Sequence, residues 1–321
     1  MAEYKGLLGL KVMLFFTIDH ERVDSIAHSL SQLGYKAFVK LDTMEPEYQI
    51  LSMIYELYND ERVVLVLGIA AALIDYRLKG DAYEFWNTLG SIVSEHLARS
   101  EQLDLGSIHD IMFEFVERDV CSRLRGQKKY RLKKFFTRYA DRLWNRDYMF
   151  LSEKPEKIWY VLAKAMDQKL FDKTIVFAMK VLDLVSLITK GRYADFKNVK
   201  YIPINYHVVR MSLYSGILKP VKRDSLDLSK EIEYVLRDNN AKYLISEAWY
   251  QVAIKTSNML GERISTLRID SLLWQLSKRI RRGMSKREAI NALTDYLTSK
   301  ARVEYDVAYN VALELLHSYQ L

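Results

Sequence analysis

The sequence predicts an all-α protein, and three observations carry this prediction. Turn-forming residues are scarce, with only 12 glycines and 4 prolines in 321 residues, whereas a β-protein of this size needs many turns. Apolar residues recur at three-to-four spacing in nearly every segment, with little strict alternation. Half of the chain is apolar and 28% is charged, which is the balance of a globular protein with a substantial core.

The apolar spacing places the helices, and capping residues set several of their ends. The predicted helices are 20–34, 46–59, 62–78, 82–98, 106–121, 128–143, 156–168, 173–190, 205–215, 228–238, 242–259, 270–282, 285–299 and 303–319. The predicted N-caps are Asp172, Asn205, Asp270 and Ser285. The predicted glycine stops are Gly80, Gly191, Gly216 and Gly283. A short strand is predicted near Val12–Thr17.

Several functional classes are excluded by composition. A single cysteine, Cys121, rules out an intrachain disulfide and a cysteine-based zinc or iron–sulfur site. The six histidines show no metal-ligand spacing, so we expect no metal and no cofactor. The longest apolar run, Val63–Ile74, is too short to span a bilayer and predicts a buried core helix. Leu7–Ile18 is interrupted by Lys11 and does not resemble a signal peptide, so we expect a cytoplasmic protein without membrane contact.

Basic residues are concentrated in two segments, although the net charge of +7 is mild. Between residues 123 and 146, ten basic side chains and several aromatic ones accompany a single acid, Asp141. A second basic cluster lies at 278–287. Solvated helix faces would explain both clusters, and so would a surface for a polyanion, most simply nucleic acid. The residues expected to contact a phosphate backbone are Arg125, Lys128, Lys129, Arg131, Lys133, Lys134, Arg279 and Arg282.

The helix predicted at 173–190 is apolar almost all round, and two lysines interrupt it. Lys173, Phe177 and Lys180 are spaced i, i+4 and i+7, so they share one face. Lys173 also lies in the first turn, where the helix dipole is positive. Burial, the dipole and Lys180 would favour the neutral amine of Lys173, a nucleophile that forms Schiff bases with aldehydes. The alternative is that both amines reach solvent at the edge of a core helix.

Two further helix starts carry polar residues that capping alone would explain. Asn205 follows Pro203 at the mouth of a helix, a position that suits a catalytic group as well as a cap. Asp270 is likewise predicted as an N-cap, and Trp274 lies one turn later on the same face, so the pair would flank a flat ligand. Trp86 by itself is interpreted as a core residue.

Five motifs share their order and spacing with a known family. They are LDTMEPEY at 41–48, ALIDYRLKG at 72–80 followed by Trp86, KTIVFAMK at 173–180, IPINYHVVR at 202–210 and DSLLW at 270–274. Each motif is loose by itself, but together they cover the chain from about Leu41 to Lys278. The chain resembles the archaeal 8-oxoguanine DNA glycosylase/lyase (archaeal GO glycosylase), a divergent branch of the helix-hairpin-helix glycosylases. The resemblance implies a helical body of two lobes with the active site between them.

The resemblance also implies a reaction. A damaged guanine is flipped out of the duplex and stacked between aromatic rings. Lys173 would then attack the sugar C1′, and the resulting Schiff base would eliminate the 3′ phosphate. The pocket residues assigned by resemblance are Phe177 and Trp274 as stacking rings, Trp86 as a wall, and Lys180 and Asp270 as polar groups.

The chain departs from the family pattern at three places. Asn205 stands where the family has a catalytic aspartate, and an amide lacks the charge that stabilises the cationic sugar. Glu47 stands where the family has a glutamine that reads the base edge; a carboxylate accepts from guanine N1–H and the N2 amine but rejects acceptor-rich edges. The hairpin at 166–171 contains no glycine, although the usual hairpin offers glycine amides to a DNA phosphate.

The leading hypothesis is a DNA base-excision repair enzyme that acts on 8-oxoguanine through a lysine Schiff base, with altered specificity or weak excision because of Asn205. The alternatives are a binding protein for modified bases or abasic sites, and an all-α protein-interaction module. We expect a monomer that binds double-stranded DNA with a damaged base or abasic site and associates with the nucleoid. The predicted parts are an N-terminal extension at 1–40, a glycosylase-like domain at 41–282 and a helical extension at 283–321.

Overall fold

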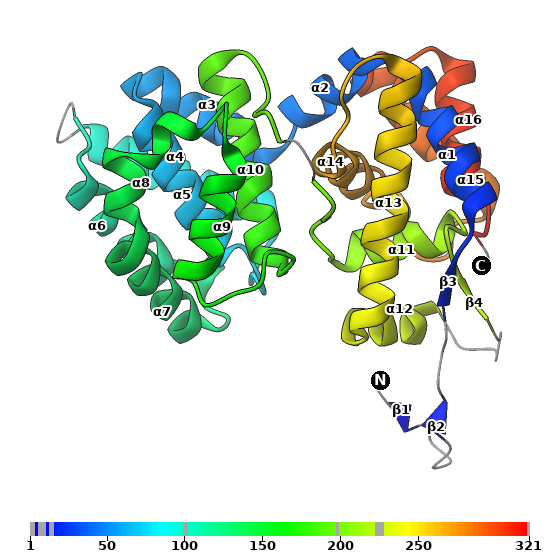
Figure 1. The fold of residues 1–321 in the computed structure, drawn as a ribbon, viewed down its shortest axis with the longest axis horizontal. Helices are drawn as coiled ribbons and strands as arrows, with labels where there is room; N and C mark the ends of the chain where they lie inside the picture. Colours follow the sequence, from blue (N-terminus) through cyan, green and yellow to red (C-terminus); the bar gives the residue numbers. More distant parts are fainter. Residues whose placement is uncertain are drawn as a thin grey trace. The chain divides into compact units, whose positions relative to one another are not determined.

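The computed structural model describes residues 4–5, 11–12, 16–98, 102–196, 199–221 and 228–319 (Figure 1). The chain forms two compact units: unit 1 comprises Met1–Asp42 and Val199–Leu321, and unit 2 comprises Thr43–Asn198. Both are built of helices, so the predicted all-α class is confirmed. The segments predicted as extensions, 1–40 and 283–321, fall in the same unit as 199–282, and their separate functional roles stay a prediction.

Unit 2 surrounds a helix that is buried along its whole apolar length. Every residue of α4 from Val63 to Ile74 is buried, as the apolar run predicts. The helices of this unit are α3 (Pro46–Tyr58), α4 (Glu61–Ile74), α5 (Ala82–Leu97), α6 (Leu105–Glu117), α7 (Arg125–Phe135), α8 (Asp141–Asn145), α9 (Pro155–Ala165) and α10 (Lys173–Lys190). Short helical turns η1 (Asp119–Cys121), η2 (Phe136–Ala140) and η3 (Asp147–Phe150) connect some of them.

Helices α4 and α10 approach each other closely at Gly68. A Cβ atom added to Gly68 would lie 2.9 Å from Cγ1 of Val181 and 3.2 Å from Cδ1 of Leu51. Because a glycine keeps this crossing tight, α10 packs directly on α4 and also contacts α3. The crossing therefore fixes where the start of α10 lies within unit 2.

The hairpin before α10 differs in detail from its prediction. Asp172 precedes the helix as expected, but its carboxylate accepts from the backbone N–H of Lys169 at 2.9 Å and does not cap α10. Asp167, in the same turn, has a positive φ of 51°. The predicted helix 128–143 is also divided, because a π-helical turn, η2, separates α7 from α8.

Unit 1 joins the two ends of the described chain. Its helices are α1 (His20–Gln32), α2 (Tyr35–Thr43, of which the last residue belongs to unit 2), α11 (Tyr206–Tyr214), α12 (Leu228–Arg237), α13 (Asn239–Leu260), α14 (Thr266–Ser277), α15 (Lys286–Tyr296), η4 (Leu297–Ala301) and α16 (Tyr305–Leu315). Helix α1 lies beside α13 and α16 (Figure 1). Arg22 of α1 donates to the carbonyls of Ser215 and Glu314, so it links three distant segments.

Small strands accompany the helices of unit 1. Strands β1 (Tyr4–Lys5) and β2 (Lys11–Val12) pair antiparallel, as do β3 (Phe16–Ile18) and β4 (Leu218–Pro220). The predicted strand near Val12–Thr17 overlaps β2 and β3, and its residues 13–15 lie outside the described part of the chain. No described helix is long and apolar enough to cross a membrane.

Capping predictions in unit 1 were confirmed at two sites and wrong at a third. Asn205 accepts from the N–H of Val208 at 3.0 Å, and Ser285 forms a capping box with Glu288. Asp270 is not a cap, because α14 begins four residues earlier at Thr266 and Asp270 lies buried inside it. Helix α2 was missed, because its nine residues include three charged side chains and carry no capping signal.

Candidate functional site

The two lysines of α10 have opposite environments. Lys173 is the first residue of the helix and is exposed, so the expectation that burial surrounds it is wrong. Lys180 is only 2% exposed. Phe177 lies between them and is partly exposed, with the Lys180 Nζ 5.7 Å from its ring centroid. The predicted face of amine, ring and ammonium therefore exists, with the amine of Lys173 at its solvent end.

Lys180 is held by two buried acids that precede and begin α3. Its Nζ lies 2.5 Å from Glu45 Oε2 and 3.5 Å from Glu47 Oε1. Glu45 is fully buried and Glu47 is 4% exposed. Burial raises the pKa of Glu45 to about 8, and the adjacent Glu47 acts in the same direction, while Lys180 lowers it. We call Glu45, Glu47 and Lys180 the acid–lysine cluster.

A further carboxylate, that of the partly exposed Asp75, directly follows the last residue of α4. It accepts from the indole N–H of Trp86 at 3.3 Å. Burial raises the pKa of Asp75, and the positive charges of Lys173, Lys128 and Lys180 act against this increase. Trp86 is fully buried, so its indole supports Asp75 from within the core. Asp75 therefore interacts electrostatically with the exposed Lys173 and is hydrogen-bonded to the buried Trp86.

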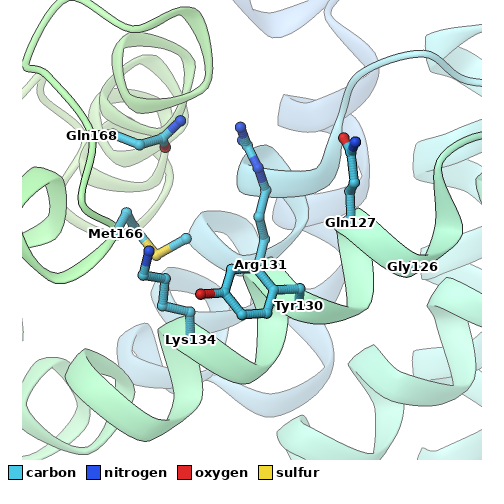
Figure 2. Close-up of a pocket in the computed structure, with 7 residues that line it drawn as sticks. All are labelled: Gly126, Gln127, Tyr130, Arg131, Lys134, Met166 and Gln168. Atoms are coloured by element: carbon cyan, nitrogen blue, oxygen red, sulfur yellow. The ribbon is translucent and has the colours of Figure 1, made fainter.

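Unit 2 also contains a hollow of about 420 Å³ beside the hairpin (Figure 2). Figure 2 shows side chains of α7 along one side and those of Met166 and Gln168 from the hairpin along the other. The lining residues are Gly126, Gln127, Tyr130, Arg131, Lys134, Met166 and Gln168. Two of the predicted phosphate-binding residues, Arg131 and Lys134, thus line one surface with the hairpin.

Arg131 connects this hollow to the start of α10. Its guanidinium donates to Thr174 Oγ1 at 2.8 Å and to the carbonyl of Leu73 at 3.2 Å. Thr174 in turn donates to the side-chain oxygen of Gln168 at 3.3 Å. Because Thr174 follows Lys173, these bonds fix the hairpin and the first turn of α10 together.

The predicted phosphate-binding residues of α7 other than Arg131 fall into three groups. Lys128 is fully buried beneath Tyr76, so the expectation that it faces a phosphate is wrong. Others are exposed or partly exposed but already paired with acids: Arg125 and Lys129 with Glu117, and Lys134 with Asp167. Lys133 is exposed, and the described part of the chain offers it no ion pair.

Asn205 lies at the start of α11 in unit 1. Its side-chain oxygen accepts from the N–H of Val208, which fixes the amide over the first turn. Arg210, one turn later, donates to the carbonyls of Ser277 and Ile280, so α11 is bound to the end of α14. His207 contacts Ser277 Oγ at 3.1 Å, and its ring lies edge-on to Trp274 at 6.4 Å.

Asp270 and Trp274 both lie on α14, one turn apart. Asp270 is 2% exposed and Trp274 is partly exposed. The Nζ of Lys278 lies 4.4 Å from the Trp274 ring centroid. Nearby, Arg268 is buried and paired with Asp42 at 2.7 Å. The polar and aromatic residues predicted on this helix thus share its surface.

The basic cluster after α14 is solvent-exposed. Arg279 and Arg282 are both exposed, and the Arg279 guanidinium stacks over the Tyr296 ring at 4.3 Å. Their exposure agrees with a role in phosphate binding, which stays a prediction. The predicted site residues are therefore divided, with Lys173, Phe177, Lys180, Trp86 and Glu47 in unit 2 and Asn205, Asp270 and Trp274 in unit 1.

Comparison with known proteins decides the family. The model of the AGOG family, described as N-glycosylase/DNA lyase, matches residues 27–308. The chain belongs to this family. Among related proteins, the N-glycosylase/DNA lyase of Pyrobaculum aerophilum is 21% identical over 258 residues, which are 80% of this chain and 87% of that protein.

A solved AGOG structure has the same fold. It is Pa-AGOG, the 8-oxoguanine DNA glycosylase from Pyrobaculum aerophilum, complexed with 8-oxoguanosine. The TM-score is 0.63 at 22% sequence identity, and the match covers 85% of this chain and 96% of the other. The predicted resemblance is confirmed, and this AGOG chain is a DNA glycosylase/lyase with DNA as its substrate.

Two acidic residues that interact with the lysines of α10 were not singled out from the sequence. Glu45 and Asp75 lie inside the quoted motifs, but each follows or precedes a helix, where an acid usually faces solvent. Burial marks Glu45, and the hydrogen bond from Trp86 marks Asp75. For Glu45, the sequence signal was the presence of two acids in the segment MEPE at 44–47. Lys180 needs only one of them as a counter-charge.

Proposed function

We propose that this AGOG protein removes 8-oxoguanine from double-stranded DNA and cleaves the resulting strand through a Schiff base on Lys173. The observation that carries the proposal is the position of Lys173. Its amine is exposed at the positive end of α10, next to Phe177, while the carboxylate of Asp75 and the acid–lysine cluster lie behind it. An exposed amine with this setting suits attack on a sugar carbon better than a snorkelling surface lysine does.

The reaction would proceed in two steps. The Lys173 nitrogen bonds to C1′ as the bond from C1′ to the base breaks, and the base leaves with a proton. Ring opening gives a C1′=N iminium, and loss of a C2′ proton then expels the 3′ phosphate. In unit 2, Phe177 would stack on the flipped base, with Trp86 behind it and Lys180 and Glu47 as polar groups. For Trp274 and Asp270 of unit 1, the proposed roles as a stacking ring and a polar group rest on the family resemblance.

Asn205 would make base release the weaker step. Its amide oxygen is committed to the N–H of Val208, and the amide carries no charge for the cationic sugar. The lyase step begins from an aldehyde and needs the amine more than a carboxylate. We therefore expect strand cleavage at an existing abasic site to be more efficient than excision of the base.

The duplex backbone would be held by exposed basic residues. Three exposed members of the predicted set form no ion pair with a carboxylate of the described chain. They are Lys133 on α7, and Arg279 and Arg282 after α14. The hollow beside the hairpin, lined by Arg131 and Lys134, is a further proposed phosphate-binding surface of unit 2. We propose that the active protein is a monomer, because one chain carries every residue that the reaction needs.

The test is borohydride trapping with duplexes that carry 8-oxoguanine, an abasic site or neither. Reduction of the iminium links protein and DNA permanently, so the adduct reports the Schiff base. We expect an adduct with both lesions, stronger with the abasic site, and its loss in Lys173→Ala. Lys190→Ala is the matched control, because Lys190 is an exposed lysine at the other end of α10, paired with Glu61.

The trapping results distinguish the proposed enzyme from the alternative functions. An undiminished adduct in Lys173→Ala would overturn the assignment of the nucleophile. An adduct with the abasic duplex alone would place base removal on a different lesion. Duplex binding with no adduct would make the protein a reader of DNA, and the absence of duplex binding at low salt would reject the DNA-processing role.

A further inference from the structure

The acid–lysine cluster contains one carboxyl group more than its charge requires. Glu45, Glu47 and Lys180 are all at least 96% buried. The Lys180 ammonium lies 2.5 Å from Glu45 and 3.5 Å from Glu47, so both acids meet one cation. Removing a charge from water is costly unless a partner neutralises it. Two ionised carboxylates on one ammonium would leave a net negative charge in the interior.

On the described helices that pack against α3, the charged groups do not supply a second counter-ion for the two acids. Helix α4 is followed by the carboxylate of Asp75, which is an acid and adds no cation. On α10, Asp183 accepts from the backbone N–H of Ala194, and Lys173 lies at the exposed end of the helix. Helix α5 contributes Trp86, which is uncharged. A bound proton is therefore the simplest way to neutralise the cluster, as in other close carboxyl pairs.

We infer that Glu45 and Glu47 hold one proton between them, and that this acid–carboxylate pair, oriented by Lys180, reads the edge of the flipped purine. The inference rests on the proposed function and names a positioning residue, Glu45, that acts through Glu47. A shared proton gives the pair a donor and an acceptor. A lone carboxylate would offer acceptors only. The pair would therefore present both kinds of group that an amide presents.

A purely structural role does not explain the second acid. One buried carboxylate suffices to pair with Lys180, and a second adds desolvation cost without adding a cation. The cluster also lies against Phe177, the ring proposed to stack on the base, with Nζ 5.7 Å from its centroid. A second carboxyl group that costs desolvation energy and lies beside the proposed stacking ring therefore indicates a role in binding the base.

The proton makes recognition depend on pH. Glu45 has its pKa raised to about 8 by burial and by Glu47, so the pair is singly protonated below that pH and loses the proton above it. At pH 9, about one pair in ten would keep its proton, since each unit above the pKa changes the ratio about tenfold. Affinity for a purine edge that needs the donor should fall accordingly.

The experiment measures 8-oxoguanosine binding to the full chain by calorimetry between pH 6.5 and 9.5 (about neutral to alkaline, spanning the pKa of Glu45). Because Glu45 loses its proton, the wild-type affinity for 8-oxoguanosine should fall about tenfold for each pH unit above 8. Ionisation of the ligand adds a separate effect. Ligand ionisation acts equally on all variants, so the comparison removes it. In Glu45→Gln, whose amide imitates the protonated acid, the additional fall should disappear.

Two further variants keep the test decisive. Glu47→Gln removes the need for a shared proton and should also lose the additional alkaline fall, so it serves if Glu45→Gln does not fold. Glu61→Gln alters an acid outside the cluster, paired with Lys190, and should keep the wild-type profile. Identical profiles in wild type and both cluster variants, or no nucleoside binding at any pH, would overturn the inference.

The inference and the proposed function fail in different ways. Nucleoside binding needs no catalysis, and trapping at an abasic duplex needs no base. A Lys173 adduct with no dependence of binding on Glu45 or Glu47 would reject only the shared proton. A pH-dependent nucleoside site without any adduct would reject only the Schiff-base chemistry.

Discussion

Asn205 is the residue at which fold and chemistry can be tested separately. Asparagine and aspartate are nearly equivalent as N-caps, and the side-chain oxygen already accepts from Val208. Changing one to the other therefore alters the charge at the mouth of α11 while its capping bond remains. The same exchange at a fully buried position would also carry the cost of removing a charge from water.

We predict that Asn205→Asp increases the excision rate of 8-oxoguanine by about two to three orders of magnitude, the usual effect of one electrostatic group in a transition state. The rate would be measured under single-turnover conditions, with cleavage of an abasic duplex as a parallel reaction. The lyase rate should change much less. Equal changes in both reactions would show that the carboxylate acts on the amine and not on the sugar cation.

Lys173 and Lys180 show what sequence could and could not predict at this scale. Their spacing along an apolar helix placed both on one face, and the structure agrees. Which of them is buried did not follow, because burial of Lys180 depends on Glu45 and Glu47 from a segment about 130 residues earlier. Pairings between distant segments leave no local pattern.

At the scale of elements, the crossing of α4 and α10 positions the proposed nucleophile. We predict that Gly68→Ala destabilises the protein by about 1–3 kcal/mol, because the new methyl group would overlap Val181 in a filled core. Thermal unfolding would measure the loss. Gly126→Ala is the matched control: it lies in α7 with no atom within 4 Å, so it should not destabilise. Equal effects of both changes would contradict the tight crossing.

Helix α7 has a buried and an exposed lysine only five residues apart, and these predict different phenotypes. Lys133→Gln should weaken duplex binding and reduce the slope of log affinity against log salt by about one, because one phosphate contact is lost. Lys128→Met should leave that slope unchanged, since Lys128 is fully buried. Binding titrations at several salt concentrations would measure both. A reduced slope for Lys128→Met would contradict its buried position.

Element boundaries followed from local signals at some helix ends only. Gly80 and Gly283 were predicted as stops, but α4 ends at Ile74 and α14 at Ser277. The predicted helix 173–190 matches α10 at both ends, because Gly191 adopts the left-handed conformation that ends a helix. The start of α14 was predicted four residues late, because Asp270 has the sequence of a cap but lies inside the helix. The π-helical turn between α7 and α8 has no sequence signal in this chain.

At the scale of the whole molecule, unit 2 is a single continuous segment with its own buried helix. We predict that residues 43–198 fold as an isolated chain and unfold in one cooperative thermal transition. Circular dichroism would measure both helix content and the transition. The fragment should not excise 8-oxoguanine, because Asn205, Asp270 and Trp274 are absent from it. A non-cooperative melt would contradict the independence of this unit.

The interruption of unit 1 by unit 2 has a consequence for the order in which the protein forms during synthesis. Strand β3 pairs with β4, and α1 packs on α13 and α16, so the first helix must wait for segments that leave the ribosome about 200 residues later. Unit 2 is complete much earlier and can fold first. The nascent chain therefore acquires its lysine-bearing half before the half that carries Asn205 and Trp274.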